Sequence, residues 1–349
     1  MALFGTVSPD KPLTNRNLII NGAMQIAQRN TSVTGITTLG YYTADRWSID
    51  VGSAGTWTMN VESSGPTGTE FRKSANVICT TADSSLSSGD NLVFQHRFEG
   101  QNLQGIKKGT ANAESLTLSF YVKSSNTGTY ICEFFDADNT RQISKSYTIN
   151  AANTWEKKTI TVPPDATGQF DNDNALSLYL QFWLASGSDR TSGTLNSSAW
   201  ATSVQTNRVV GQLNLANAVG NYFAITGVQM EIGTVATPYE WRNYGEELHL
   251  CQRYYEILSV GAAMVMPVGL GQNFQNRKGI GPFCFKVEKR TSPTIPNRTI
   301  GIDGGDGTHA FTFSSTTSMC TGASSSSSPT ISAADLTEGA FTILADSEL

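Results

Sequence analysis

Alternating apolar and polar positions predict that most of the chain forms short β-strands. The clearest alternation runs over residues 176–184. Every even position there is apolar: Leu176, Leu178, Leu180, Phe182 and Leu184. The odd positions are polar or aromatic: Ser177, Tyr179, Gln181 and Trp183. Successive side chains of a strand point to opposite faces, so the first set predicts a core face and the second an outward face of aromatic and amide groups.

Further short strands are expected on both sides of this segment. Their patterns lie at 116–122, 130–135, 147–149, 158–162 and 222–232. Glycine and asparagine turns separate these runs. Many short strands with almost no helix predict a mainly β fold, in which two packed sheets form a jelly-roll β-sandwich over residues 17–240.

One amphipathic helix is predicted after this domain, at residues 244–255, within a linker placed at 241–256. Apolar residues recur there at helical spacing: Tyr244, Leu248, Cys251 and Tyr255. Glu246 and Glu247 in the first turn suit the helix dipole, and Pro238 prevents an earlier start. We expect the apolar stripe to be an interface, packed either between the domains or against sister chains.

A small C-terminal β domain is expected at 257–349, and an N-terminal arm at 1–16. The strand patterns of the C-terminal domain alternate with long turns rich in glycine and serine. Because such a domain has a limited core, we expect it to lean on a neighbour or on its own copies. The arm carries Pro9 and Pro12 and little periodicity, so it is expected to dock on another protein or along the next domain.

The charge content argues against nucleic-acid binding. Charged residues make up 15% of the chain and the net charge is −5, whereas phosphate binding requires clustered Lys and Arg. The densest basic stretch, 286–290, is interpreted as a solvated strand face. No apolar run reaches the roughly 18 residues of a membrane helix, and the N-terminus lacks a signal-peptide pattern. We therefore expect assembly in a cytoplasm and no membrane insertion.

The cysteine pattern predicts free thiols. The five cysteines are Cys79, Cys132, Cys251, Cys284 and Cys320. Their odd number, their wide spacing and the lack of a CxxC motif do not support a zinc or redox site. Buried free thiols are expected, which suits assembly in a reducing compartment.

Two parts of the chain resemble bacteriophage tail-fibre and receptor-binding virion proteins. The first combines NRNLIINGAMQIAQRN at 15–30 with YYTADRWSID at 41–50, and the second is GVQMEIGTVATPYEWRNYGEELHLCQRYYEIL at 227–258. In such proteins the pair brackets a jelly-roll module similar to carbohydrate-binding modules. The runs at 115–136 and 153–165 look like the middle strands of this module. The resemblance implies a virion location, in a tail or fibre, with other virion proteins bound through the arm.

No catalytic motif is found in the sequence. His96, His249 and His309 lie far apart without a partnered nucleophile, and neither GxSxG nor HExxH occurs. A depolymerase tailspike usually has a long repetitive β-helix, and no such repeat is present. We therefore predict that the chain is not an enzyme. Carboxylates that pair only in space, as in glycosidases, leave a glycan-degrading enzyme as the last-ranked interpretation.

Two acidic turns offer hard oxygen ligands. Asp171 and Asp173 lie in the turn 171–174, and a similar turn occurs at 136–139. Such residues suit Ca²⁺, but they also suit ordinary turns. We predict no cofactor, with a structural calcium ion at Asp171 and Asp173 as the alternative.

A sugar-binding strip is predicted on the outward face of 176–184. Aromatic rings stack on pyranose faces, and amides bond the hydroxyls. Tyr179, Gln181 and Trp183 supply this mixture, and loop residues Trp200 and Tyr42 extend it. A protein interface is an equally good interpretation of the same strip. Trp47 and Trp155 are interpreted as core or framework residues.

The leading interpretation is a phage virion protein that mediates host attachment by binding surface polysaccharide without cleaving it. We expect a homotrimer, because symmetric assembly multiplies weak sugar contacts and covers a small domain. The alternative is a purely structural virion protein, such as a capsid fibre, tail adaptor or decoration, that binds other virion proteins.

Overall fold

The computed structural model describes residues 15–260, 278–295, 298–301, 308–324 and 341–349. Side chains are described for 15–258, 284–295, 315–319 and 344–349. The chain divides into two compact units between Tyr244 and Gly245, with Leu349 grouped in the first unit. Each unit has its own antiparallel sheets.

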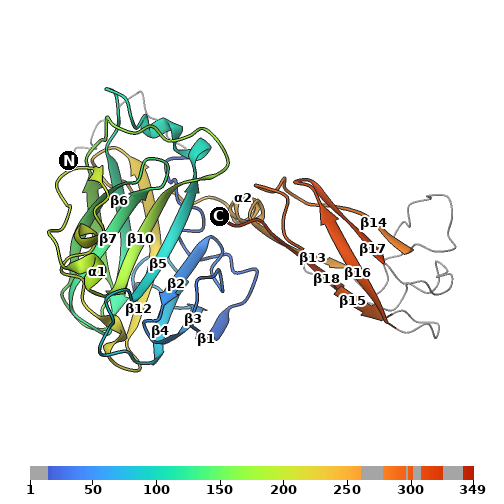
Figure 1. Ribbon diagram of the computed structural model, residues 1–349, viewed down its shortest axis with the longest axis horizontal. Coiled ribbons are helices and arrows are strands. Elements are labelled where there is room, and N and C mark those ends of the chain that lie inside the picture. The colour runs from blue at the N-terminus through green and yellow to red at the C-terminus, as the bar shows by residue number, and fades with distance from the viewer. Residues whose placement is uncertain (1–14, 261–277, 296–297, 302–307, 325–340) are drawn as a thin grey trace. The chain divides into compact units, whose positions relative to one another are not determined.

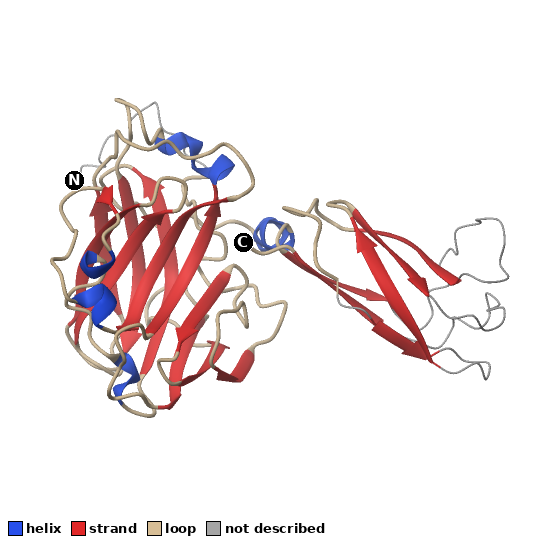
Figure 2. Cartoon of the chain, in the orientation of Figure 1, coloured by secondary structure: helices blue, strands red, loops and turns tan. Residues whose placement is uncertain are grey.

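The first unit is a jelly-roll β-sandwich of two six-stranded antiparallel sheets (Figures 1 and 2). In spatial order, the first sheet contains β1 (Ser32–Ile36), β3 (Thr56–Glu62), β4 (Ser74–Thr81), β12 (Tyr222–Ile232), β6 (Leu116–Ser124) and β9 (Glu156–Val162). The second contains β11 (Ala201–Thr202), β8 (Arg141–Ile149), β7 (Gly128–Asp136), β10 (Leu176–Ser186), β5 (Asn91–Glu99) and β2 (Trp47–Gly52). The predicted mainly β fold is confirmed.

The core lies between the two sheets and follows the predicted alternation. On β10, Leu178, Leu180 and Phe182 are fully buried in it. Leu176 lies at the strand end and is only half-buried. Trp47 is also fully buried and stacks on Phe94 with 5.0 Å between ring centroids, so its interpretation as a core residue is confirmed.

Short helices connect the strands of the first unit. These are the 3₁₀ turns η1 (Gly100–Ile106), η2 (Gln205–Asn207) and η3 (Leu215–Asn217), and the short α-helix α1 (Ser188–Thr191). The connection from β10 to β12 contains α1, β11, η2 and η3. This long connection supplies residues that cover the outward face of β10.

The second unit combines one helix with two small sheets. Helix α2 (Tyr244–Gln252) is followed by β13 (Tyr255–Val260), which pairs with β18 (Phe341–Asp346). A four-stranded sheet has the order β14 (Lys278–Cys284), β17 (Met319–Ser324), β16 (Thr308–Ser315) and β15 (Arg298–Gly301). Among the described residues, no helix is both long and apolar enough to cross a membrane.

Two expectations for the second unit are wrong in detail. The helix ends at Gln252 instead of 255, because the chain turns there and β13 pairs with β18 from Tyr255 onward. The basic stretch 286–290 is not a solvated strand face. Lys289 is buried and forms an ion pair with the equally buried Glu256.

Three cysteines match the expectation of buried free thiols: Cys79, Cys132 and Cys251. Cys284 is also free but exposed, because it lies at the end of β14. The side chain of Cys320 lies outside the described residues.

Candidate functional site

The predicted sugar strip points outward from the core but is covered by the chain itself. Trp183 is only 2% exposed and joins a second apolar cluster with Val209. Its indole donates to Glu133 at 2.9 Å, and the Arg208 guanidinium lies 5.3 Å from its ring centroid. Gln181 is buried as well and bonds Gln95 and Arg208. As placed, neither Trp183 nor Gln181 is open to a sugar.

The other three predicted sugar contacts do not complete such a strip. Tyr179 is half-buried, with the Arg97 guanidinium 5.3 Å from its ring centroid. Tyr42 bonds Thr38 in its own loop. Trp200 is buried and donates to the main-chain oxygen of Pro163.

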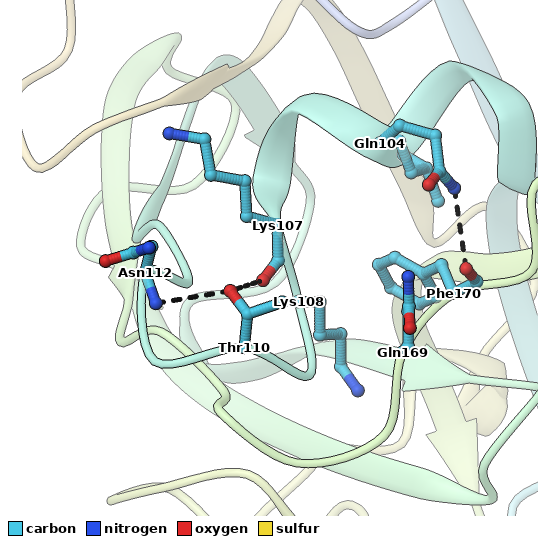
Figure 3. Close-up of a pocket in the computed structure, with 8 residues that line it drawn as sticks. Gln104, Lys107, Lys108, Thr110, Asn112, Gln169 and Phe170 are labelled. Carbon is cyan, nitrogen blue, oxygen red and sulfur yellow. Dashed lines mark hydrogen bonds between the residues drawn. The ribbon is translucent and has the colours of Figure 1, made fainter.

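A polar cavity of about 320 Å³ opens beside η1 in the first unit. The lining residues come from η1 and the following turn and from the loop between β9 and β10: Leu103, Gln104, Lys107, Lys108, Thr110, Asn112, Gln169 and Phe170. Figure 3 shows Lys107, Thr110 and Asn112 on one side, and Gln104, Gln169 and Phe170 on the other. The volume lies at the lower end of the range for small-molecule sites, which is about 300–1,000 Å³.

Several polar groups of the cavity are available to a ligand. Among the described residues, the side-chain amides of Asn112 and Gln169 make no hydrogen bond. Gln104 directs its Nε2 to main-chain oxygens, including that of Gly100 at 2.9 Å, so its Oε1 remains an acceptor. The Lys107 ammonium is half exposed and lies 3.5 Å from Glu114. The cavity therefore presents donors and acceptors beside the ring of Phe170.

A buried ion network holds the residues around this cavity in place. Lys108 follows η1 and pairs with Asp136, at the end of β7, and with Asp165 at 3.1 Å. Arg141, at the start of β8, donates to both oxygens of Asp165 at 2.8 and 2.9 Å. Burial raises the pKa of Asp165, but hydrogen bonds from Arg141, Thr167 and Lys108 outweigh it, so the pKa lies below its usual value.

The predicted residue Trp200 belongs to this network rather than to a sugar strip. The Lys108 ammonium lies 5.3 Å from its ring centroid and 5.1 Å from that of Phe170. The main-chain oxygen of Trp200 accepts from Arg141. The aromatic rings thus pack around a buried cation at the edge of the cavity.

The outer face of the first sheet carries a group of rings and lysines that sequence reasoning missed. Its core side is formed by apolar residues such as Phe120 and Val122, so Tyr121 and Lys123 of β6 point outward. The Lys123 ammonium lies 5.2 Å from the ring centroid of Trp155 and 5.7 Å from that of Tyr222. Trp155 is half-buried on this face, so it lies outside the core, and a framework role for it stays a prediction.

Hydrogen bonding fixes the position of Tyr222 in this group. Its phenol donates to Asn153 at 2.7 Å. Burial and, after it, the Glu62 carboxylate raise the pKa of Tyr222. The phenol therefore stays protonated and keeps this bond at neutral pH.

The predicted calcium ligands serve ordinary turns. Asp171 and Asp173 are exposed. The Asp171 amide donates to Asp138 at 3.0 Å, and Asp173 accepts from the amide of Ala175 at 2.9 Å. Within the described part of the chain, no group of three or more His, Cys, Asp or Glu side chains converges to hold a metal ion. Calcium at Asp171 and Asp173 stays an untested alternative.

The predicted interface stripe is only partly buried. Tyr244 is 64% exposed, Leu248 is half-buried, and Cys251 is fully buried. Tyr255 is buried but lies on β13 rather than on the helix. The stripe is therefore not fully solvent-exposed, and its role as an interface stays a prediction.

The sequence segments that resemble phage proteins pack on one another in a seam of the first unit. The Leu18 amide donates to Met230, and the Val228 amide donates to Gly22. Asn17 accepts from the Met230 amide at 3.1 Å through its side chain. A Cβ on Gly22 would overlap the main-chain oxygen of Val228. These segments thus have a structural role in closing the module.

Further contacts extend the seam. Arg242 donates to the main-chain oxygens of Asn17 and Ile19. The side-chain amide of Asn21 donates to the main-chain oxygens of Ile26 and Asp45, at 2.8 and 2.9 Å. Asp45 belongs to the segment 41–50. The segments 15–30, 41–50 and 227–258, which carry the resemblance, therefore all contribute to the seam.

Comparison with known proteins gives only distant similarities. No protein-family model and no curated protein matches the sequence. Among solved structures, the enzymatically active domain of tailspike protein 4 of bacteriophage CBA120 matches 62% of this chain at 14% identity and a TM-score of 0.32, but only 21% of that chain is covered. TmCBM61, in complex with beta-1,4-galactotriose, matches 62% at 9% identity and a TM-score of 0.32, with 99% of it covered.

The tripod from the baseplate of bacteriophage Tuc2009 is also similar. It matches 65% of this chain at 12% identity and a TM-score of 0.27, with 58% of that chain covered. Similar structures thus include phage tail proteins and a carbohydrate-binding module. Such low identities and TM-scores do not establish a shared function.

Proposed function

We propose that this chain is a phage virion protein that attaches the particle to its host by binding a surface polysaccharide without cleaving it. The observation that supports glycan binding is the polar cavity beside η1. Its available amides and its ammonium match a pyranose, which has hydroxyls at its edge.

The lining of the cavity supports binding rather than cleavage. None of the eight described residues that line it carries a carboxyl group. Most glycosidases place two carboxyl groups on either side of the bond that they break. Bound sugar in this cavity would therefore meet hydrogen-bonding groups but no acid–base pair from its lining.

The expected partners follow from the same proposal. We propose a homotrimer that presents several copies of the cavity to the host surface. Several linked sites bind a polymer of repeated units with higher avidity than a single site does. Residues 1–14 of the arm lie outside the described residues, and attachment to other virion proteins through the arm is part of the proposal. Light scattering on the purified chain will measure its mass, with three copies expected.

Removing the available amides will test the cavity. The double variant Asn112→Ala/Gln169→Ala loses two hydrogen-bonding groups, so we expect host-glycan affinity to fall about 5- to 30-fold. The measurement is titration calorimetry with polysaccharide extracted from host cells. Asn30→Ala removes an exposed amide elsewhere and serves as the matched control.

Three results would contradict the proposal. Unchanged affinity in the double variant would place the glycan elsewhere on the protein. Release of reducing sugar from the polysaccharide would show an enzyme. A wild-type chain that binds neither polysaccharide nor host cells would favour the structural alternative.

That alternative has an observation of its own. Trp241 is 43% exposed and packs in a ring cluster with Phe71 and Tyr239, at 5.2 and 4.9 Å between centroids. Exposed aromatic groups are common in protein interfaces. Trp241→Ala would then weaken incorporation into particles, measured by the copy number in purified virions, without changing glycan binding.

A further inference from the structure

The outer face of the first sheet has the features of a second binding site, separate from the cavity. The strand register aligns a row of residues across four strands. Asn60 of β3 lies opposite Asn76 of β4, Asn76 opposite Ala224 of β12, and Ala224 opposite Lys123 of β6. Ala224 and Asn76 in the middle of this row are buried, whereas Lys123 at its end is half-buried.

Aromatic rings flank the lysine end of the row. Lys123 extends between Trp155 and Tyr222, both half-buried. On the neighbouring row, Tyr121 lies opposite Lys157 of β9, and the Lys157 ammonium is 5.7 Å from the Tyr121 ring centroid. Two ammonium groups are therefore held near aromatic rings on adjacent strands.

Neither ammonium is neutralised by a carboxylate. Among the described residues, Lys123 and Lys157 take part in no ion pair. By contrast, Lys108 and Lys158 each pair with at least one carboxylate. An ammonium that is held over aromatic rings and takes part in no ion pair is a suitable partner for a carboxylate of a ligand.

The centre of the face contains polar atoms without partners. Asn76 is 4% exposed, Ser74 1% and Thr226 0%, and none of their side-chain oxygens has a hydrogen-bond partner. The Asn60 Oδ1 is also without a partner. Buried acceptors of this kind are costly unless something donates to them. These oxygens lie beneath the surface of the face, so the accessible contacts of the site are its lysines and rings.

We propose that this face binds an acidic polysaccharide, with its carboxylates at Lys123 and Lys157 and its sugar faces against Trp155 and Tyr222. This site is additional to the proposed cavity and uses none of its residues.

The charges on the face favour a sugar polymer over a nucleic acid. Glu62 lies on the same face at β3 and accepts from Asn60 at 3.4 Å. A chain with a phosphate on every unit would meet this carboxylate as well as the two lysines. A polysaccharide with fewer charges can place its carboxylates at β6 and β9 and neutral units over β3 and β4.

Affinity electrophoresis of the full chain will test the site. The acidic probes are polygalacturonate, alginate and hyaluronate. Carboxyl-reduced polygalacturonate is the uncharged control polymer. We expect retardation by at least one acidic polymer and little by its neutral counterpart. Lys123→Met should weaken acidic binding about 10-fold or more, since it removes one charge-assisted bond. Trp155→Ala should weaken it too.

The control is Lys286→Met, which removes the same charge at an exposed position of the second unit and should leave acidic binding unchanged. Thermal melting will check that Lys123→Met stays folded.

Three results would overturn the inference: binding to none of the acidic polymers, equal binding to the carboxyl-reduced polymer, or no effect of Lys123→Met. Tighter, Lys123-dependent binding of single-stranded DNA would also overturn it. Failure of the cavity variants affects only the proposed function, because the two tests change different residues.

Discussion

His96 shows how one buried side chain links the stability of the first unit to pH. It is 1% exposed and its ring lies 5.1 Å from that of Trp47 and 4.6 Å from that of Phe98. Burial, followed by the nearby Arg46, lowers its pKa well below 6.5, although the Ile20 carbonyl acts in the opposite direction. The folded state therefore holds the neutral ring.

Acidification should destabilise the first unit through this ring. Below pH 6.5 the unfolded chain binds a proton on this ring, whereas the folded chain does not. The free energy of unfolding is therefore highest above that pH and falls below it. The free energy of unfolding falls by about 1.4 kcal/mol for each pH unit below that point. We expect His96→Leu to reduce the stability difference between about pH 7.5 and about pH 5, measured by urea unfolding. His249→Gln, at an exposed position, should leave that difference as in wild type, and an unaltered difference in His96→Leu would contradict the assignment.

Two tryptophans show where prediction from sequence stops at the residue scale. Strand alternation correctly placed Trp183 off the core face, but it could not show that a loop more than twenty positions away covers it through Val209 and Arg208. Trp155 precedes β9 and showed no alternation of its own, so its position beside Lys123 became clear only from the paired strands. Periodicity predicts which face a residue takes, whereas exposure depends on distant segments.

Among the elements, the turns around η1 depend on the ion network centred on Lys108. This residue contacts Asp136 of β7, Asp165 of the β9–β10 loop and the main-chain oxygens of Thr167 and Gly168. One buried ammonium thus joins three connections that are distant in sequence. The cavity residue Gln169 follows directly after two of these contacts.

Removing this cation should leave the buried carboxylate of Asp136 without a cation, whereas Asp165 keeps Arg141. We expect Lys108→Met to lower the free energy of unfolding by about 3–5 kcal/mol, measured by urea unfolding. The double variant Lys108→Met/Asp136→Asn should recover part of the loss, because one buried charge is then removed. Lys107→Met, at an exposed position, is the matched control, and an equal effect of both single variants would contradict the network's role.

Strand elements were predictable from sequence, but element ends and charged contacts were not. The alternation located β6 and β10, because each has one face in the core. The end of α2 depends on pairing of β13 with β18, nearly ninety positions later, and no local pattern shows it. Lys289 likewise looked solvated, because its partner Glu256 lies on β13, more than thirty positions earlier.

At the scale of the whole molecule, the seam makes the first unit independent. Segments at 15–30 and 227–242 bond each other, so the sandwich closes within one stretch of chain. The resemblance identified both segments from the sequence, but only the folded structure shows that they contact each other. The candidate sites were even less predictable, since the cavity joins two distant connections and the outer face of the first sheet joins several strands.

The seam predicts that residues 15–244 fold alone. We expect this fragment to melt at the same temperature as the matching transition of the full chain, measured by calorimetry. Gly22→Ala should lower its stability by about 1–3 kcal/mol, because the added methyl overlaps the Val228 oxygen. Gly89→Ala is the control, since a Cβ there meets only Asp189 at 3.7 Å. A fragment that does not melt cooperatively would refute the independence of the unit.

The seam also bears on how such proteins diversify. Because the chain enters and leaves the sandwich at the same place, the module is a cassette with adjacent ends. Recombination at those ends can exchange one module for another without altering what precedes or follows it. Under the two proposals above, changes in the rings around Lys123 or in the amides beside η1 would alter the ligand, while Asn17, Gly22 and Arg242 keep the seam closed.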